Sequence, residues 1–94
     1  MHAAALEVDV RLPQSTSLKD KRAVLRSVLD GARNRYQVAS AEVGHQDRRQ
    51  RALLGFAAVA GTSGHVVQVL DEVERFVWSF PELEVVSTER TWTE

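Results

Sequence analysis

The hydrophobic residues of this 94-residue chain change their spacing along the sequence, and the order of the spacings limits the folds open to it. Over residues 2–12 apolar and polar side chains alternate, which is the pattern of a strand with one buried face. Pro13 cannot donate a hydrogen bond to a neighbouring strand, so it ends the predicted strand. The residues expected on the buried face are Ala4, Leu6, Val8, Val10 and Leu12.

Two later segments have the spacing of amphipathic helices, each with a single apolar stripe. The first covers residues 17–36 and starts at Ser17, whose hydroxyl suits an N-cap with Asp20 three residues later. The second covers residues 66–80 and stops at Pro81. The two stripes are Leu18, Leu25, Val28, Leu29, Ala32 and Tyr36, and then Val66, Val69, Leu70, Val73, Phe76, Val77 and Phe80.

Three further segments are predicted to be strands, over residues 37–43, 51–60 and 83–92. A polar, turn-like segment over residues 44–50 joins the first two of them. The strand at 51–60 is almost wholly apolar, which suits a central strand covered on both faces. In the last strand Val85 and Val86 are adjacent, and this break in the alternation indicates a β-bulge.

The elements therefore follow the order β-α-β-β-α-β, which is that of the ferredoxin-like fold. We predict an α+β sandwich over residues 1–94 as a single domain, with a four-stranded antiparallel sheet and both helices on one face. The other face would be open and apolar, and a second copy of the chain would be its simplest cover. The residues expected on the open face are Ala3, Ala5, Leu53, Gly55, Ala57 and Val59.

Several short segments of the chain resemble the YlxP-like family, a bacterial domain of unknown function. They are SLKDKR at residues 17–22, NRYQV at 34–38, AEV at 41–43, HQD at 45–47 and QRA at 50–52. The resemblance covers essentially the whole chain, and the combination is more specific than any one segment. It implies a ferredoxin-like fold and a frequent gene neighbourhood among translation and ribosome-maturation factors. It implies no reaction, cofactor or catalytic residue.

The charges are distributed unevenly, although the net charge is only −1. Residues 1–51 hold ten Lys or Arg and six Asp or Glu, whereas residues 52–94 hold two and seven. In the predicted topology Arg11, the start of the first helix and the central hairpin turn meet at one end of the molecule. A basic cluster there is suited to phosphate groups and predicts salt-dependent binding of nucleic acid. The candidate contacts are Lys19, Lys21, Arg22, Arg26, Arg48, Arg49 and Arg51.

The aromatic residues of the chain limit the ways in which it could bind RNA. RNA-recognition domains of this topology stack bases on aromatic residues of the two middle strands, but the first strand has none and the strand at 51–60 has only Phe56. RNA would therefore be bound through charge and shape at the helix end. The competing interpretation is that these cations form a solvated helix face, partly paired with Asp20, Asp30 and Asp47.

The sequence contains no pattern typical of a metal site or of a catalytic site. The chain has no cysteine, and His2, His45 and His65 do not have the spacing of a closed metal-ligand set. Capping explains the hydroxyls at residues 15–17, and no nucleophile–base pair is visible. We therefore expect no catalytic residue, no metal or other cofactor and no small-molecule substrate. With no apolar run near 20 residues and no basic segment before an apolar one, we expect a cytoplasmic protein without a membrane partner.

Two functions stay open. The first is a small non-enzymatic protein that binds RNA or ribosomal components through the basic cluster, and it predicts binding that weakens steeply with salt. The second is a protein-interaction or homodimerisation module that uses the open sheet face together with Trp78 and Trp92, with no nucleic acid involved. This second function predicts association that tolerates salt.

Overall fold

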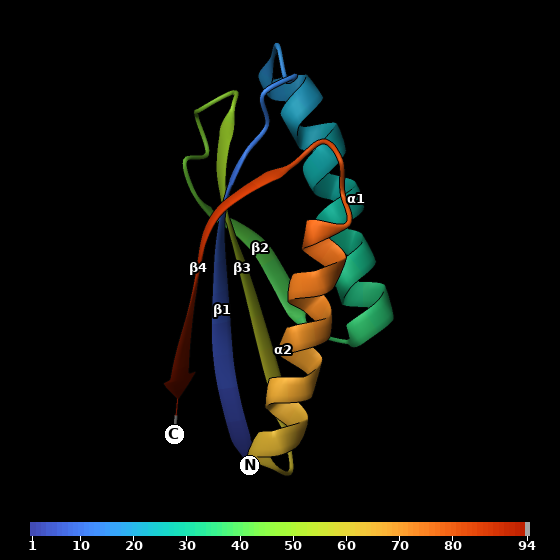
Figure 1. Cartoon of the computed structure of the whole chain (residues 1–94), viewed down its shortest axis with the longest axis vertical. Coiled ribbons are helices and arrows are strands. Elements are labelled where there is room, and N and C mark those ends of the chain that lie inside the picture. Colours follow the sequence, from blue (N-terminus) through green and yellow to red (C-terminus); the bar gives the residue numbers. More distant parts are fainter. Residues whose placement is uncertain (94) are drawn as a thin grey trace.

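The computed structural model describes residues 1–93 and contains six elements in the predicted order (Figure 1). All strand pairs are antiparallel, and the sheet has the strand order β2-β3-β1-β4. The prediction of a ferredoxin-like α+β fold is thus confirmed. The elements are β1 (His2–Arg11), α1 (Leu18–Tyr36), β2 (Ala39–Gly44), β3 (Arg51–Ala60), α2 (Ser63–Trp78) and β4 (Glu84–Thr93).

Both helices pack on the same face of the sheet, and the core lies between the two layers (Figure 1). Helix α1 contacts β2 and α2, whereas α2 contacts β1 and β3. The five apolar residues predicted for the buried face of β1 are all enclosed. The buried residues of the helices are Leu25, Val28 and Ala32 in α1 and Val66, Leu70, Val73 and Val77 in α2.

Strand β3 differs from the expectation that it would be covered on both faces. Ala52, Leu54, Phe56 and Ala58 are buried under the helices, but the residues between them face away from the helices. Since both helices lie on one side, the described residues leave that opposite face uncovered, and Val59 keeps 62% of its surface exposed. The open face predicted from the sequence is therefore present, and the prediction of two covered faces was wrong.

The helix ends explain where the boundaries differ from the prediction. The Ser17 hydroxyl accepts a hydrogen bond from the Asp20 amide, so the predicted N-cap is confirmed. Gln37 adopts a left-handed conformation, with φ of 57°, and closes α1, so β2 starts only at residue 39. Thr62 caps α2 through the His65 amide, and the helix begins three residues before the apolar stripe does. Helix α2 also ends two residues before the predicted end, because Pro81 disfavours helical geometry at the residue that precedes it.

The two helices approach each other closely at Gly31. A Cβ atom at this position would lie 2.6 Å from Cζ of Phe76. The Phe76 ring cannot easily retreat, because Tyr36 and Phe80 contact it edge to face and Arg35 covers it at 5.1 Å. Glycine is therefore required here by packing and not by backbone conformation.

We expect Gly31→Ala to destabilise the protein by about 1–3 kcal/mol through overpacking, although alanine is the better helix former by about 1 kcal/mol. The matched control is Gly64→Ala in the first turn of α2, where an added Cβ meets no atom within 4 Å. This control should be neutral or stabilise by less than about 1 kcal/mol. Urea denaturation measures both changes, and equal stability of the two variants would contradict the packing argument.

Candidate functional site

The start of α1 and the β2–β3 connection lie together at one end of the molecule, at the top of Figure 1. Between them lies Lys21, whose side chain is only 1% exposed. Its Nζ donates hydrogen bonds to backbone carbonyls at both ends of the connection and forms an ion pair with β2. The four oxygens are those of His45 at 2.9 Å, Gln46 at 3.3 Å and Arg51 at 3.2 Å, and Oε2 of Glu42 at 2.7 Å.

An ammonium group has three N–H donors, and this one has four oxygens within reach. Burial of a charge is tolerated only when it is paired and hydrogen-bonded, and Glu42 supplies the compensating charge. Among residues 1–93, Oε2 of Glu42 has no partner besides Lys21, so the two charges depend on each other. Lys21 is therefore a structural residue.

Lys21 must be removed from the predicted set of nucleic-acid contacts, because an enclosed ammonium cannot reach a phosphate at the surface. The sequence contains the signal for this burial. Lys21 precedes Leu25, Val28 and Ala32 by four, seven and eleven residues, which places it on the apolar stripe of α1. A lysine on the buried stripe of a helix indicates a polar partner inside the fold.

A second tether holds the β2–β3 connection from the side of β1. The Gln50 side chain donates to the carbonyls of Pro13 and Ser15, at 3.3 and 3.1 Å. The Leu12 amide donates to the Gln50 carbonyl at 3.0 Å. The connection is therefore fixed at both ends, while Arg48 and Arg49 between the tethers are exposed.

Arg51 makes an ion pair on the open face of the sheet. Its Nη2 lies 2.8 and 2.9 Å from the two carboxylate oxygens of Asp9, and both side chains are about three-quarters buried. Asp9 neutralises much of its charge, so Arg51 is a weaker candidate contact than the arginines before it. Its Nε is buried and has no partner within the described residues.

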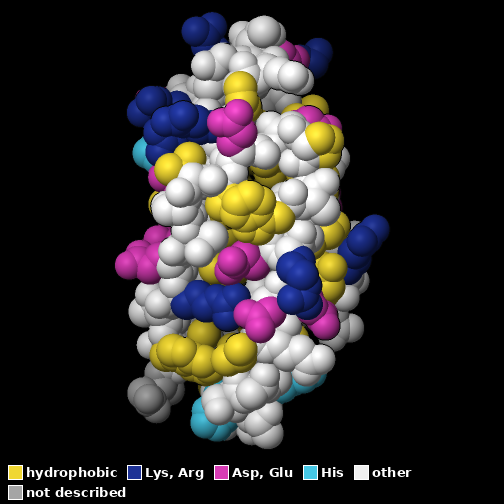
Figure 2. Space-filling view, in the orientation of Figure 1, with side chains coloured by type: hydrophobic (Ala, Val, Ile, Leu, Met, Phe, Trp, Pro, Cys, Tyr) yellow, Lys and Arg dark blue, Asp and Glu magenta, His cyan; other side chains and the backbone are white. Residues whose placement is uncertain are grey.

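Arginines surround a shallow depression at this end. It has a volume of about 430 Å³, and Glu84 is the one acidic side chain in its lining. The lining residues are Arg11, Pro13, Arg48, Gln50, Arg51 and Glu84. A second depression of about 320 Å³ is lined by Asp47, Arg48, Arg49, Gln50 and Arg51. Figure 2 shows dark blue side chains gathered at the upper left, where Figure 1 places the β2–β3 connection.

The remaining basic candidates, Lys19, Arg22 and Arg26, are exposed on one flank of α1. Arg33 lies on the same flank and donates to the Ser40 carbonyl, so this flank faces the β2 edge of the sheet. Within residues 1–93, Lys19, Arg22 and Arg26 form no ion pair, whereas Arg33 is paired with a neighbouring aspartate. Three unpaired cations therefore lie along the β2 edge of the sheet, next to the β2–β3 connection.

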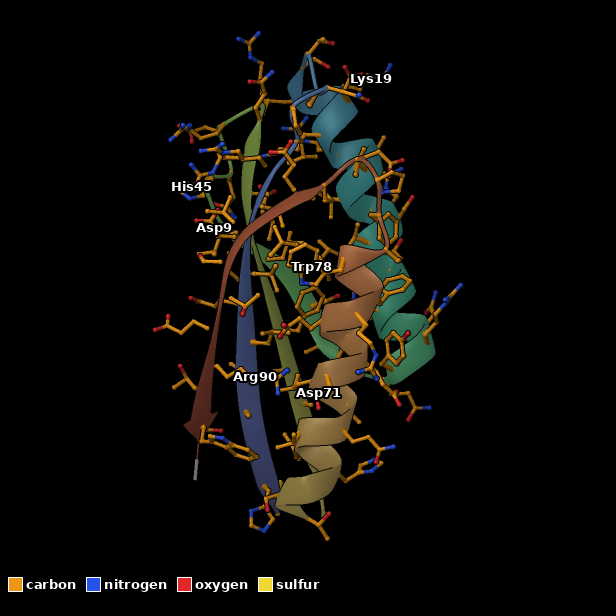
Figure 3. All side chains as sticks on the ribbon, in the orientation of Figure 1. Asp9, Lys19, His45, Asp71, Trp78 and Arg90 are labelled. Carbon is orange, nitrogen blue, oxygen red and sulfur yellow. The ribbon has the colours of Figure 1, made fainter. Side chains whose placement is uncertain are left out.

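Trp78 and Trp92 are 60% and 46% exposed, and both lie on the helix side of the sheet. Trp92 is placed there because it pairs with Ala4, whose side chain is buried under the helices. The tryptophans therefore do not belong to the open sheet face, with which the sequence analysis had grouped them. Figure 3 shows Trp78 above the contact between Asp71 of α2 and Arg90 of β4.

Arg90 joins β4 to α2 through Asp71 at 2.8 Å and Glu74 at 3.2 Å. Partial burial opposes its charged form, but the two carboxylates outweigh this effect and raise the pKa of Arg90 above its ordinary value. Arg75 and Trp78 complete the lining of a cavity of about 290 Å³ here. Its two acids and two arginines balance, so the surface offers no excess charge to a ligand.

Neither a metal cluster nor a membrane span is found in the described part of the chain. No group of three or more His, Asp or Glu side chains is arranged to hold a metal ion among residues 1–93. No described helix is both long enough and apolar enough to cross a membrane.

The model of a protein family of unknown function, DUF503, matches residues 3–90, which is nearly the whole chain. The chain belongs to the DUF503 family. It is also similar to the uncharacterized protein YlxP of Bacillus subtilis (strain 168), with 41% identity over 76 residues that cover 81% of this chain and 83% of that protein. The resemblance to the YlxP-like family inferred from short segments is thus confirmed.

Four of the five segments that carry this resemblance, all except NRYQV, meet in space at Lys21. SLKDKR supplies Lys21 itself, AEV supplies Glu42, and the HQD and QRA segments supply three carbonyl acceptors. Segments up to 30 residues apart in the sequence are thus joined through one ammonium group. The resemblance is therefore concentrated at the structural support of the basic surface.

We expect Lys21→Met to destabilise this DUF503 protein by about 3 kcal/mol, because the change leaves Glu42 without its partner in a site that is 18% exposed. The double variant Lys21→Met/Glu42→Leu should recover part of that loss, since it removes both charges together but leaves the three carbonyls without their donor. Urea denaturation of the two variants beside the wild type measures the difference. A double variant no more stable than the single one would contradict the charge-pair explanation.

Asp20 stabilises the start of α1 in a pH-dependent way. The Thr16 hydroxyl and amide donate to its carboxylate and lower the pKa of Asp20 from its ordinary value of 3.8. Because the pKa is lower in the folded protein than in the unfolded chain, the stabilisation is present at neutral pH. It is lost as the pH falls through the folded-state pKa.

The stability difference between the wild type and Asp20→Asn should therefore shrink as the pH falls from about 5 through 3.8 and on toward the lower folded-state pKa. Urea unfolding midpoints across this range provide the measurement. A difference that stays constant with pH would show that the carboxylate charge contributes nothing to this cap.

Proposed function

We propose that this protein is a small non-enzymatic RNA-binding protein that contacts the RNA phosphate backbone through its basic end. We define the basic end as Arg11, Lys19, Arg22, Arg48, Arg49 and Arg51. The observation that carries the proposal is the depression in which Arg11 and Arg48, together with Arg51 that is paired with Asp9, surround a concave surface with one acid in its lining. Guanidinium groups bind phosphate oxygens in a bidentate manner, and a concave arginine surface suits a phosphate better than a flat one does.

The placement of charge supports this proposal despite the net charge of −1. Residues 18–51, from α1 to the start of β3, contain nine Lys or Arg and four Asp or Glu. Residues 63–93, which include α2 and β4, contain two Lys or Arg and six Asp or Glu. Strands β2 and β4 are opposite edges of the sheet, so the basic and acidic parts lie on different sides. A local positive field can attract RNA when the sum of charges is negative.

The open sheet face favours recognition by charge and shape over base stacking. Its positions on β1 and β3 carry small, aliphatic or charged residues and no aromatic residue, and Phe56 is buried on the opposite face. Single-stranded RNA bound to a sheet of this topology needs exposed aromatic residues. Structured RNA presents closely spaced phosphates and 2′-hydroxyls, and it is the form that such a surface suits. The gene neighbourhood implied by the YlxP-like family, translation and ribosome maturation, favours ribosomal RNA in the cytoplasm.

A second candidate function is self-association or protein binding through the open sheet face. Val43 and Val59 are 49% and 62% exposed there, and a shallow apolar groove of about 310 Å³ crosses β1, β2 and β3. Contacts of this kind would tolerate salt and would not depend on the basic end. RNA binding takes precedence because the basic end is both concave and charged.

We expect Arg48→Ala and Arg49→Ala each to weaken binding of structured RNA and to lower the slope of log affinity against log salt by about 1. The control is Arg75→Ala, which removes the same charge from an exposed position on α2. This control should keep the wild-type affinity and slope. Filter binding or fluorescence anisotropy at 50 and 200 mM salt measures both quantities.

Absence of wild-type binding at 50 mM salt, or an equal effect of all three substitutions, would contradict the proposal. In that case the oligomeric state of the wild type and of Val59→Lys would test the second candidate. Salt-tolerant association that Val59→Lys disrupts would support the open sheet face.

A further inference from the structure

We propose that Lys21 is a positioning residue for RNA binding: it never touches RNA, but it holds the β2–β3 connection in the conformation that presents Arg48 and Arg49. The inference rests on the proposed function of the basic end. It assigns a role in binding to a residue that the sequence places among the contacts and the structure places in the interior.

The geometry joins Lys21 to both ends of the connection at once. His45 and Gln46 open the connection, and Arg51 begins the next strand. One ammonium group binds the carbonyls of all three, within 3.3 Å. The distance between the two ends is therefore set by a group that belongs to α1. The arginines between these ends keep a defined position relative to Lys19 and Arg22 of the same helix.

The local backbone needs such support. His45 has a positive φ of 58°, and the pairing of β2 with β3 is irregular between Glu42 and Gly44. Left-handed geometry is costly for a residue with a side chain and persists where surrounding contacts impose it. The turn that follows is closed by the Arg48 amide, which donates to the His45 carbonyl. The same carbonyl accepts from Lys21, so loss of the lysine weakens the position of Arg48 directly.

When Lys21 is removed, the Gln50 side chain still holds the end of the connection through its hydrogen bonds to the carbonyls of Pro13 and Ser15. At its other end the connection would keep only weaker support, such as the hydrogen bond from the Gln46 side chain to the Glu42 carbonyl at 3.2 Å, and its arginines would sample more positions. Binding would have to order them again, and this ordering opposes association although every surface charge remains. We expect a loss of affinity of about tenfold, comparable to the loss caused by one arginine contact.

The experiment uses Lys21→Met/Glu42→Leu, since this pair avoids an uncompensated buried charge and keeps all exposed basic residues. The control for lost stability is Gly31→Ala, which disturbs the contact between α1 and Phe76 and lies outside the connection. RNA affinity and its salt dependence are measured at a temperature at which both variants are folded. Backbone NMR order parameters of residues 45–50 are measured without RNA.

The expected result is about tenfold weaker RNA binding and lower order parameters at residues 45–50 in the double variant, with Gly31→Ala unchanged in both. Wild-type affinity in the double variant would overturn the inference and leave the proposed function standing if Arg48→Ala and Arg49→Ala still weaken binding. Unchanged order parameters would overturn the inference by themselves. Absence of wild-type binding at low salt would overturn the proposed function, and the role of Lys21 in binding with it.

Discussion

The ammonium group of Lys21, enclosed by three carbonyls and one carboxylate, holds together three segments that no other described contact joins in the same way. Helix α1, strand β2 and the start of β3 meet at this one nitrogen. Three of its partners are backbone carbonyls, so these hydrogen bonds fix the position of the main chain and not only that of a side chain.

The periodic segments were predictable because their information is local. Alternation in β1 and the stripe of α2 place buried residues without knowledge of any partner. Strand β3 was not predictable in this way, since alanine, glycine and leucine on both faces give the same pattern for a covered and an open face. Its open face follows from the packing of two helices on one layer, which is a property of the whole fold.

The candidate site was predictable as a region and not as a set of residues. Topology brought the right segments together, but the pairing of Arg51 with Asp9 depends on the register between β3 and β1. Similarly, the face on which Trp92 lies depends on the irregularity in β4, after which the residues that face the helices change from odd to even numbers. Lys21 was predicted to lie at the surface because lysine is charged, although its position in the sequence falls on the apolar stripe of α1.

The opposite placement of basic and acidic residues also determines how the molecule meets a polyanion. Three strand spacings separate the β2 and β4 edges, roughly 14 Å. The Debye length in physiological salt is about 8 Å, so a polyanion near the β2 edge would interact mainly with the charges of that side, while the charges at the other edge would be screened. At lower salt the charges of both sides would act on a polyanion, and the resulting torque would turn the basic side toward it before contact. The separation of the two kinds of charge would thus orient the protein, although its net charge is negative.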